Sequence, residues 1–133
     1  MSTALLISAQ DIREFHVALV QGQEIQKEAH CAVAPELYLK TFADVLGEWE
    51  INLSEIDELI VVTGPGSFTA SRVSVTIVNT LAYTKSIPLR GIENTKKLEI
   101  AALWDQVKDR LPEPSGSVLP SYDRAATITQ PKK

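Results

Sequence analysis

The sequence is poor in the residues from which disulfides and metal sites are built. Its 133 residues include one cysteine and two histidines. Because an internal disulfide needs two cysteines, Cys31 cannot form one, which fits a reducing cytoplasm. We interpret Cys31 as a small strand residue rather than a reactive thiol. His16 and His30 fall in expected strands and the acids are scattered, so we expect neither a metal site nor a cofactor.

Long hydrophobic runs and a surplus of positive charge are also missing. No apolar run approaches the roughly 20 residues of a membrane span, and no basic stretch followed by an apolar core opens the chain. We therefore expect a cytoplasmic protein without membrane association. The formal net charge of -4 argues mildly against a chain that binds nucleic acid unaided, because phosphate contacts usually need a basic patch.

What is present predicts one ordinary folded domain. The chain is 44% hydrophobic and 23% charged, which is typical of a globular protein. Three strands in an antiparallel meander precede alternating helices and strands, so we expect an α/β fold with a mixed five-stranded sheet flanked by helices. The expected strands span residues 4–8, 15–20, 24–33, 58–63 and 87–92, and the expected helices span 36–50, 70–86 and a third segment capped by Asn94 or Thr95.

Two further expectations concern the edges of this domain. The third strand is expected to have one side facing solvent. Its sequence alternates between polar residues and a second set, which comprises Ile25, Lys27, Ala29 and Cys31. Residues 1–111 are expected to form the domain. Residues 112–133 are expected to form a proline- and glycine-containing linker, a possible extra strand and a disordered tail.

The glycine turn between the fourth strand and the second helix is the most informative motif. It reads Thr63-Gly64-Pro65-Gly66-Ser67-Phe68-Thr69. Backbone amides and a helix N-terminus meet there, which favours an anion or a closely packed backbone. The candidate phosphate or nucleotide loop comprises Gly64, Pro65, Gly66, Ser67, Phe68, Thr69 and Arg72. The alternative, which is commoner, is that Ser67 and Thr69 cap the helix, and no lysine of a phosphate-binding loop follows the glycines.

The second helix has an unusually wide apolar surface. Its apolar or small residues cover roughly 200° of the helix, against the stripe of about 100° that packing on one sheet requires. We therefore expect a helix–helix interface with another subunit, although the first helix could instead supply all the cover. The candidate partner-binding residues are Leu39, Phe42, Leu46, Ala70, Val73, Ser74, Ile77, Val78 and Leu81.

Catalysis by this chain is not expected. Ser67 as a nucleophile would need a nearby base, and both histidines lie on early strands. The Gly-x-Ser-x-Gly pattern of many hydrolases is missing as well. We assign no catalytic residue and expect peptidase activity to be absent.

The glycine motif, with Arg72 behind it, resembles the signature of the bacterial TsaB (YeaZ) proteins. Residues 53–59 resemble the segment that leads into that signature, and residues 87–92 resemble the strand that follows it. The likeness covers residues 4 to about 111. It implies the first lobe of an actin/Hsp70-like ATPase fold, which is ribonuclease H-like, within the M22 glycoprotease-like superfamily.

The resemblance also implies a function in making N6-threonylcarbamoyladenosine (t6A) in tRNA. In that family the TsaB-like protein is a non-catalytic subunit that pairs through its first two helices with a TsaD-like transferase. A TsaE-like ATPase joins them, and tRNA is met only through the complex. Two alternatives remain open: a structural module that pairs with a second copy of itself, and a nucleotide-hydrolysing lobe that uses the glycine turn.

The chain departs from the family pattern at several positions. Ser8-Ala9-Gln10 replaces an Asp-Thr-Ser-like turn, and Ala34-Pro35 replaces His-Ser. Ala70 and Ser74 stand where glycines are expected, so complexes of the usual geometry could be weakened or re-angled. The family's second lobe is missing. Residues 118–124 look like its first strand, which suggests a truncated or reduced member.

Overall fold

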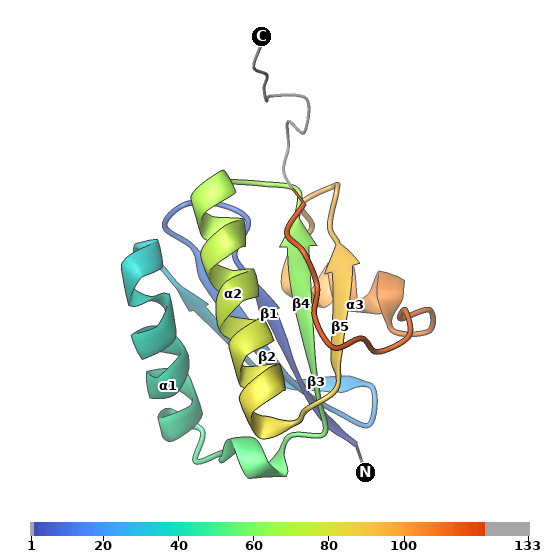
Figure 1. Ribbon diagram of the computed structural model, residues 1–133. Helices are drawn as coiled ribbons and strands as arrows, with labels where there is room; N and C mark the ends of the chain where they lie inside the picture. Colours follow the sequence, from blue (N-terminus) through green and yellow to red (C-terminus); the bar gives the residue numbers. More distant parts are fainter. Residues whose placement is uncertain (1, 122–133) are drawn as a thin grey trace, which may run out of the picture.

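The computed structural model describes residues 2–121, which form one mixed sheet with helices on both faces (Figure 1). The strand order is β3-β2-β1-β4-β5, with antiparallel β1–β2–β3 and parallel β1–β4–β5 pairing. This confirms the predicted fold class. The strands are β1 (Thr3–Ser8), β2 (Phe15–Gln21), β3 (Glu24–Cys31), β4 (Glu58–Gly64) and β5 (Leu89–Glu93). The helices are η1 (Pro35–Leu37), α1 (Tyr38–Glu48), η2 (Leu53–Glu55), α2 (Phe68–Lys85) and α3 (Ile100–Val107).

Two hydrophobic clusters lie on opposite faces of the sheet. Helices α1 and α2 cover one face and α3 covers the other (Figure 1). Because side chains alternate along a strand, Val61 of β4 enters the first cluster and Ile60 enters the second. This explains why β4 is apolar on both sides, as predicted for a central strand.

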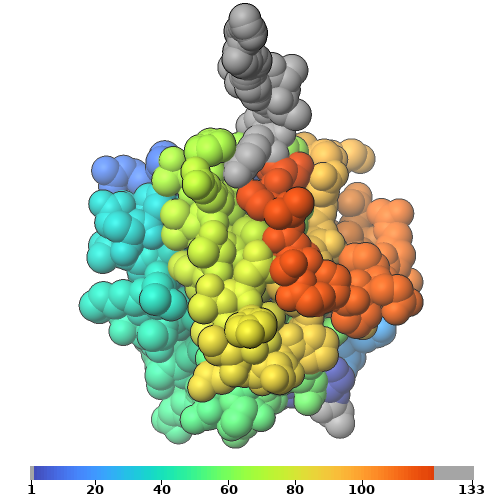
Figure 2. All heavy atoms as spheres, in the orientation of Figure 1, coloured from blue at the N-terminus to red at the C-terminus, as the bar shows by residue number. Residues whose placement is uncertain are grey.

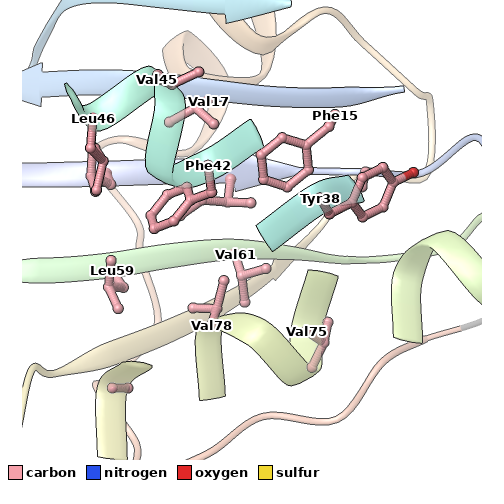
Figure 3. Close-up of a cluster of buried hydrophobic side chains, with 14 of the residues drawn as sticks. Phe15, Val17, Tyr38, Phe42, Val45, Leu46, Leu59, Val61, Val75 and Val78 are labelled. Carbon is pink, nitrogen blue, oxygen red and sulfur yellow. The ribbon is translucent and has the colours of Figure 1, made fainter. Parts of the chain in front are cut away.

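The cluster beneath α1 is built around aromatic rings. Phe15 of β2 stacks on Tyr38 with ring centroids 4.8 Å apart and meets Phe42 edge-on at 6.3 Å (Figure 3). Val75 and Val78 of α2 approach the same cluster from the other helix (Figure 3). Full burial of each such side chain stabilises the fold by about 1.5–3 kcal/mol. The cluster therefore joins both helices to one core.

The third strand does not keep one set of residues on one side. The β2–β3 register shifts between Leu19 and Val20, so that Lys27 pairs with Leu19 but Ile25 pairs with Val20. Ile25 consequently packs against the α3 cluster, whereas Ala29 packs against the α1 cluster. The predicted single alternation over β3 is wrong, because a bulge reverses the side-chain direction within the strand.

Two helix boundaries also differ from the prediction. A 3-10 turn, η1, precedes α1, which begins at Tyr38. Helix α3 begins at Ile100 rather than next to Asn94 or Thr95. Asn94 does act as a cap, but of a turn: its Oδ1 accepts the Leu98 N–H at 3.0 Å and its Nδ2 donates to the Leu98 carbonyl.

The segment 112–121 lies against the domain and runs beside α2, on the opposite flank from α1 (Figure 2). Asn79 of α2 holds it as a neighbouring strand would, since its Nδ2 donates to the Val118 carbonyl and its Oδ1 accepts the Val118 N–H, both at 2.9 Å. The Ser121 N–H donates to the Thr63 carbonyl at 2.7 Å. In the described part, residues 118–121 form no strand; the rest of the predicted strand and tail lies outside the described residues.

We predict that Asn79→Ala releases this segment. Losing both backbone hydrogen bonds should lower its local opening free energy by about 1–3 kcal/mol. Hydrogen exchange at the Val118 and Ser121 amides measures the effect directly. Thr80→Ala, which removes an exposed bond to the Thr76 carbonyl on the same helix, is the control and should leave both amides protected. Unchanged protection in Asn79→Ala would contradict the prediction.

Candidate functional site

The glycine turn lies where the carboxyl ends of β1, β4 and β5 come together. Gln10, just after β1, donates from its Nε2 to the carbonyls of Pro65 (2.7 Å) and Asn94 (2.9 Å). Its Oε1 accepts from Asn94 Nδ2 at 2.8 Å, and the Asn94 N–H donates to the Gly64 carbonyl. Both side chains are buried. A closed polar network therefore ties three chain segments to one another.

The glycines of the turn are required by close backbone packing. A Cβ at Gly66 would lie 2.3 Å from the Gln10 carbonyl oxygen, which is closer than real Cβ contacts. Gly64 has φ of +135° and a Cβ there would lie 1.8 Å from the Ser121 carbonyl oxygen. The Gly64–Pro65 peptide bond is cis. Two neighbouring segments thus occupy the space that the missing side chains leave.

The polar groups of the turn are also engaged within the chain. Ser67 is the N-cap of α2, and its Oγ accepts the Ala70 N–H at 3.2 Å. The Ser67 N–H donates to the Gln10 carbonyl at 2.6 Å. Arg72 lies over the Phe68 ring, 5.4 Å from its centroid. Of the two sequence interpretations, the geometry favours capping and packing; nucleotide binding by this turn stays a prediction.

We predict that Gly66→Ala destabilises the fold by about 1–3 kcal/mol, the range for overpacking a filled site. Gly47→Ala is the matched control, because nothing lies within 4 Å of a Cβ on that exposed glycine of α1. Replacing a helix-interior glycine with alanine should stabilise the protein by about 0.5–1 kcal/mol. Urea unfolding of the two variants compares the effects. Equal stability would show that Gly66 is not pressed against Gln10.

Most of the predicted partner-binding residues are unavailable to a partner. Five of the nine form the core between the helices and the sheet, so their assignment to an interface is wrong. Each is 7% exposed or less: Phe42, Leu46, Ala70, Ser74 and Val78. The helical wheel overstated the free surface because α1 and the sheet together cover more of α2 than one flat layer would.

The other four predicted residues remain accessible. Val73, Ile77 and Leu81 are half-buried and follow one another at i, i+4 and i+8 along α2. At about 100° per residue this row lies on the flank away from Asn79, which faces the 112–121 segment. It therefore faces the side on which α1 lies (Figure 2). Leu39 of α1 is 57% exposed.

Two side chains in the hydrophobic cluster beneath α1 have raised pKa values. Burial, and after it the charge of Glu48, raises the pKa of the Cys31 thiol. Burial also raises the pKa of Tyr38 to about 12, and the Tyr38 hydroxyl donates to the Asp11 carbonyl at 3.4 Å. The thiol is therefore less ionised than an exposed one, which agrees with its interpretation as a small strand residue.

Within residues 2–121 no group of three or more His, Cys, Asp or Glu is placed to hold a metal ion. In that same stretch no helix has both the length and the apolar character needed to cross a membrane.

Sequence patterns indicate Asn94 as a local cap but do not reveal the long-range polar contacts that organise this site. Gln10, Asn94 and Asn79 act through contacts with residues 39 to 84 positions away along the chain. The sequence indicates Gln10 only as part of a turn that departs from the family pattern. The one available signal was position, because Gln10 and Asn94 each follow an apolar strand at its carboxyl end.

Comparison with known proteins identifies the class of protein. The family model for TsaD, tRNA N6-adenosine threonylcarbamoyltransferase, matches residues 22–120, which is more than half of the chain. The chain belongs to this family.

Its relatives place it with the TsaB/YeaZ members. It is 30% identical over 54 residues to the tRNA threonylcarbamoyladenosine biosynthesis protein TsaB of Bacillus subtilis (strain 168), which is 41% of this chain and 24% of that protein. Two solved structures from Pseudomonas aeruginosa match with TM-score 0.62 and 25% identity: YeaZ, and an uncharacterized protein with similarity to peptidase YEAZ. Each match covers 71% of this chain but only 45% and 44% of those chains. The chain thus resembles the TsaB/YeaZ proteins over less than half of their length and has the expected actin-like, ribonuclease H-like fold.

Proposed function

We propose that this chain is a non-catalytic partner subunit in t6A modification of tRNA. In this role it binds a TsaD-like transferase through the α1–α2 side and holds that enzyme in its active arrangement. A TsaE-like ATPase joins the complex, and tRNA is bound only through it, in the cytoplasm. Family membership and the likeness to TsaB support the pathway. The chain matches less than half of the length of its structural relatives, so the support for a partner comes from the surface of this chain.

The accessible apolar row on α2 is the observation that carries the proposal. Val73, Ile77 and Leu81 pack with one side against the α1 core and leave the other side to solvent. Leu39, exposed on α1, adds apolar surface on the neighbouring helix. A partner helix laid along this row would bury all four residues without unfolding the core. We call these four residues the α1–α2 row.

The site residues support a binding role over a catalytic one. At the end of β1, where the resemblance leads one to expect an acidic turn, Gln10 uses its amide on two backbone carbonyls and Asn94. The Ser67 hydroxyl caps α2. Both groups are committed to hydrogen bonds that hold the fold.

We predict that Ile77→Arg prevents pairing with the TsaD-like subunit. A charge in the middle of the α1–α2 row would have to be desolvated in the interface, so affinity should fall at least about 100-fold. Calorimetric titration of the purified subunits measures it. Tyr83→Lys is the control, since this side chain is 84% exposed on the outer edge of the same helix and should pair normally.

Circular dichroism and a melting curve establish that Ile77→Arg is folded before it is titrated. Undiminished pairing of the folded variant would exclude the row as the interface. Light scattering of the wild-type chain alone distinguishes the structural alternative: a stable dimer that Ile77→Arg dissociates would mean that the row pairs two copies of this chain. Binding of ATP with Mg²⁺ to the isolated chain would favour the nucleotide-hydrolysing alternative.

A further inference from the structure

Two histidines lie side by side on the surface of the β2–β3 hairpin. His16 and His30 are directly paired across the two strands, and their Nδ1 atoms are 2.9 Å apart. They point to the α3 face of the sheet, where they line a pocket of ≈ 380 Å³ together with residues of β1 and α3. The His16 side chain is 24% exposed and the His30 side chain 50%, so solvent reaches both rings.

Each histidine is oriented by a carboxylate on its other nitrogen. His16 Nε2 lies 3.1 Å from Glu14 Oε1, and His30 Nε2 lies 2.8 Å from Glu28 Oε1. An ionised carboxylate only accepts hydrogen bonds, so in both rings Nε2 must carry the donated hydrogen. In a neutral imidazole the other nitrogen, Nδ1, then presents a lone pair. The pair therefore has two acceptor atoms facing each other at 2.9 Å, which is repulsive unless a proton or a metal ion lies between them.

The arrangement matches the way proteins prepare histidine as a metal ligand. A metal-binding histidine almost always donates its second ring N–H to a carboxylate or carbonyl, which sets its tautomer and raises its basicity. Both members of this pair have that partner. The surroundings are also suitable for a cation, because the other ionisable groups that line the pocket are three carboxylates and one ammonium: Asp11, Glu14, Glu99 and Lys97. Lys97 itself is paired with Asp11 at 3.8 Å.

We propose that His16 and His30 form a two-histidine site for a divalent transition-metal ion, with water completing the coordination. With metal–nitrogen bonds of about 2.0–2.1 Å, a 2.9 Å separation gives an N–metal–N angle of about 90°. This is the cis angle of tetragonal copper(II) or nickel(II) sites, and imidazole suits both ions. Such a site needs two protein ligands and an open pocket, not a closed cluster of three or more. The bound ion would clip the edge strand β3 to β2.

Calorimetry of the tag-free full chain with Ni²⁺ alone tests the proposal. We expect saturable binding of one equivalent, weakened at least about 10-fold in His16→Asn and in His30→Asn. Glu28→Gln should also weaken binding about 10-fold or more, because it removes the group that orients His30. Glu24→Gln, on the same exposed strand but away from both rings, is the matched control and should bind Ni²⁺ like the wild type. Both histidines are on the surface, and circular dichroism checks that the variants fold.

Electron paramagnetic resonance with Cu²⁺ identifies the ligands independently. It is done in Cys31→Ser, which removes the thiol; this is a safe background because Cys31 packs on the opposite face of the sheet. Hyperfine splitting from two nitrogens is the expected result. Equal Ni²⁺ affinity in wild type and His30→Asn, or splitting from one nitrogen, would overturn the proposal. The proposal would also be overturned if the two rings share only a proton. In that case no metal would be taken up, and NMR would detect a hydrogen between the two Nδ1 atoms.

Discussion

The close approach of two backbones at Gly66 is the constraint on which this end of the molecule depends. Strands β1 and β4 run parallel, so both carboxyl ends lie at the same edge of the sheet. The chain must leave β4 over the exit of β1, and a Cβ at Gly66 would lie 2.3 Å from the Gln10 carbonyl oxygen. With glycine there, the next N–H donates to that same carbonyl and Ser67 is in position to cap α2. One absent side chain therefore decides where the central helix starts and how it crosses the sheet.

The contact between Gly66 and Gln10 also affects which side chains at this edge of the sheet are free to bind a ligand. Gln10 and Asn94 are buried, and each satisfies backbone groups that would otherwise lack partners beside the turn. Unsatisfied groups of this kind cost about 1–3 kcal/mol each, so the network is retained for the fold. Residues used in this way are not free to bind a substrate. A role carried by the helical surface is more consistent with the structure than one carried by this edge.

The element types and their order could be predicted because they follow from periodicity and turn residues. The apolar run of β4, the apolar face of α1 and the Ser67 cap are local features, and the structure confirms them. The bulge that turns Ile25 to the other face has no local signal, since it depends on the pairing of β3 with β2. Ser74 and Val78 are buried because α1 and the sheet enclose α2. A helical wheel of α2 alone contains no information on these neighbouring elements. The Gln10–Asn94 contact joins residues 84 positions apart, beyond any spacing rule.

The sheet order keeps the two inferred binding surfaces separate. The α1–α2 row lies on the face covered by those helices, whereas His16 and His30 line a pocket on the α3 face, with His30 on the edge strand β3. The 112–121 segment takes the remaining flank of α2 (Figure 2). Because the sheet lies between the row and the histidine pair, a subunit docked on the row would leave both rings exposed. Metal binding and subunit pairing are therefore expected to be independent. A substitution in the α1–α2 row should alter subunit pairing but not metal affinity, and a substitution of either histidine should do the reverse.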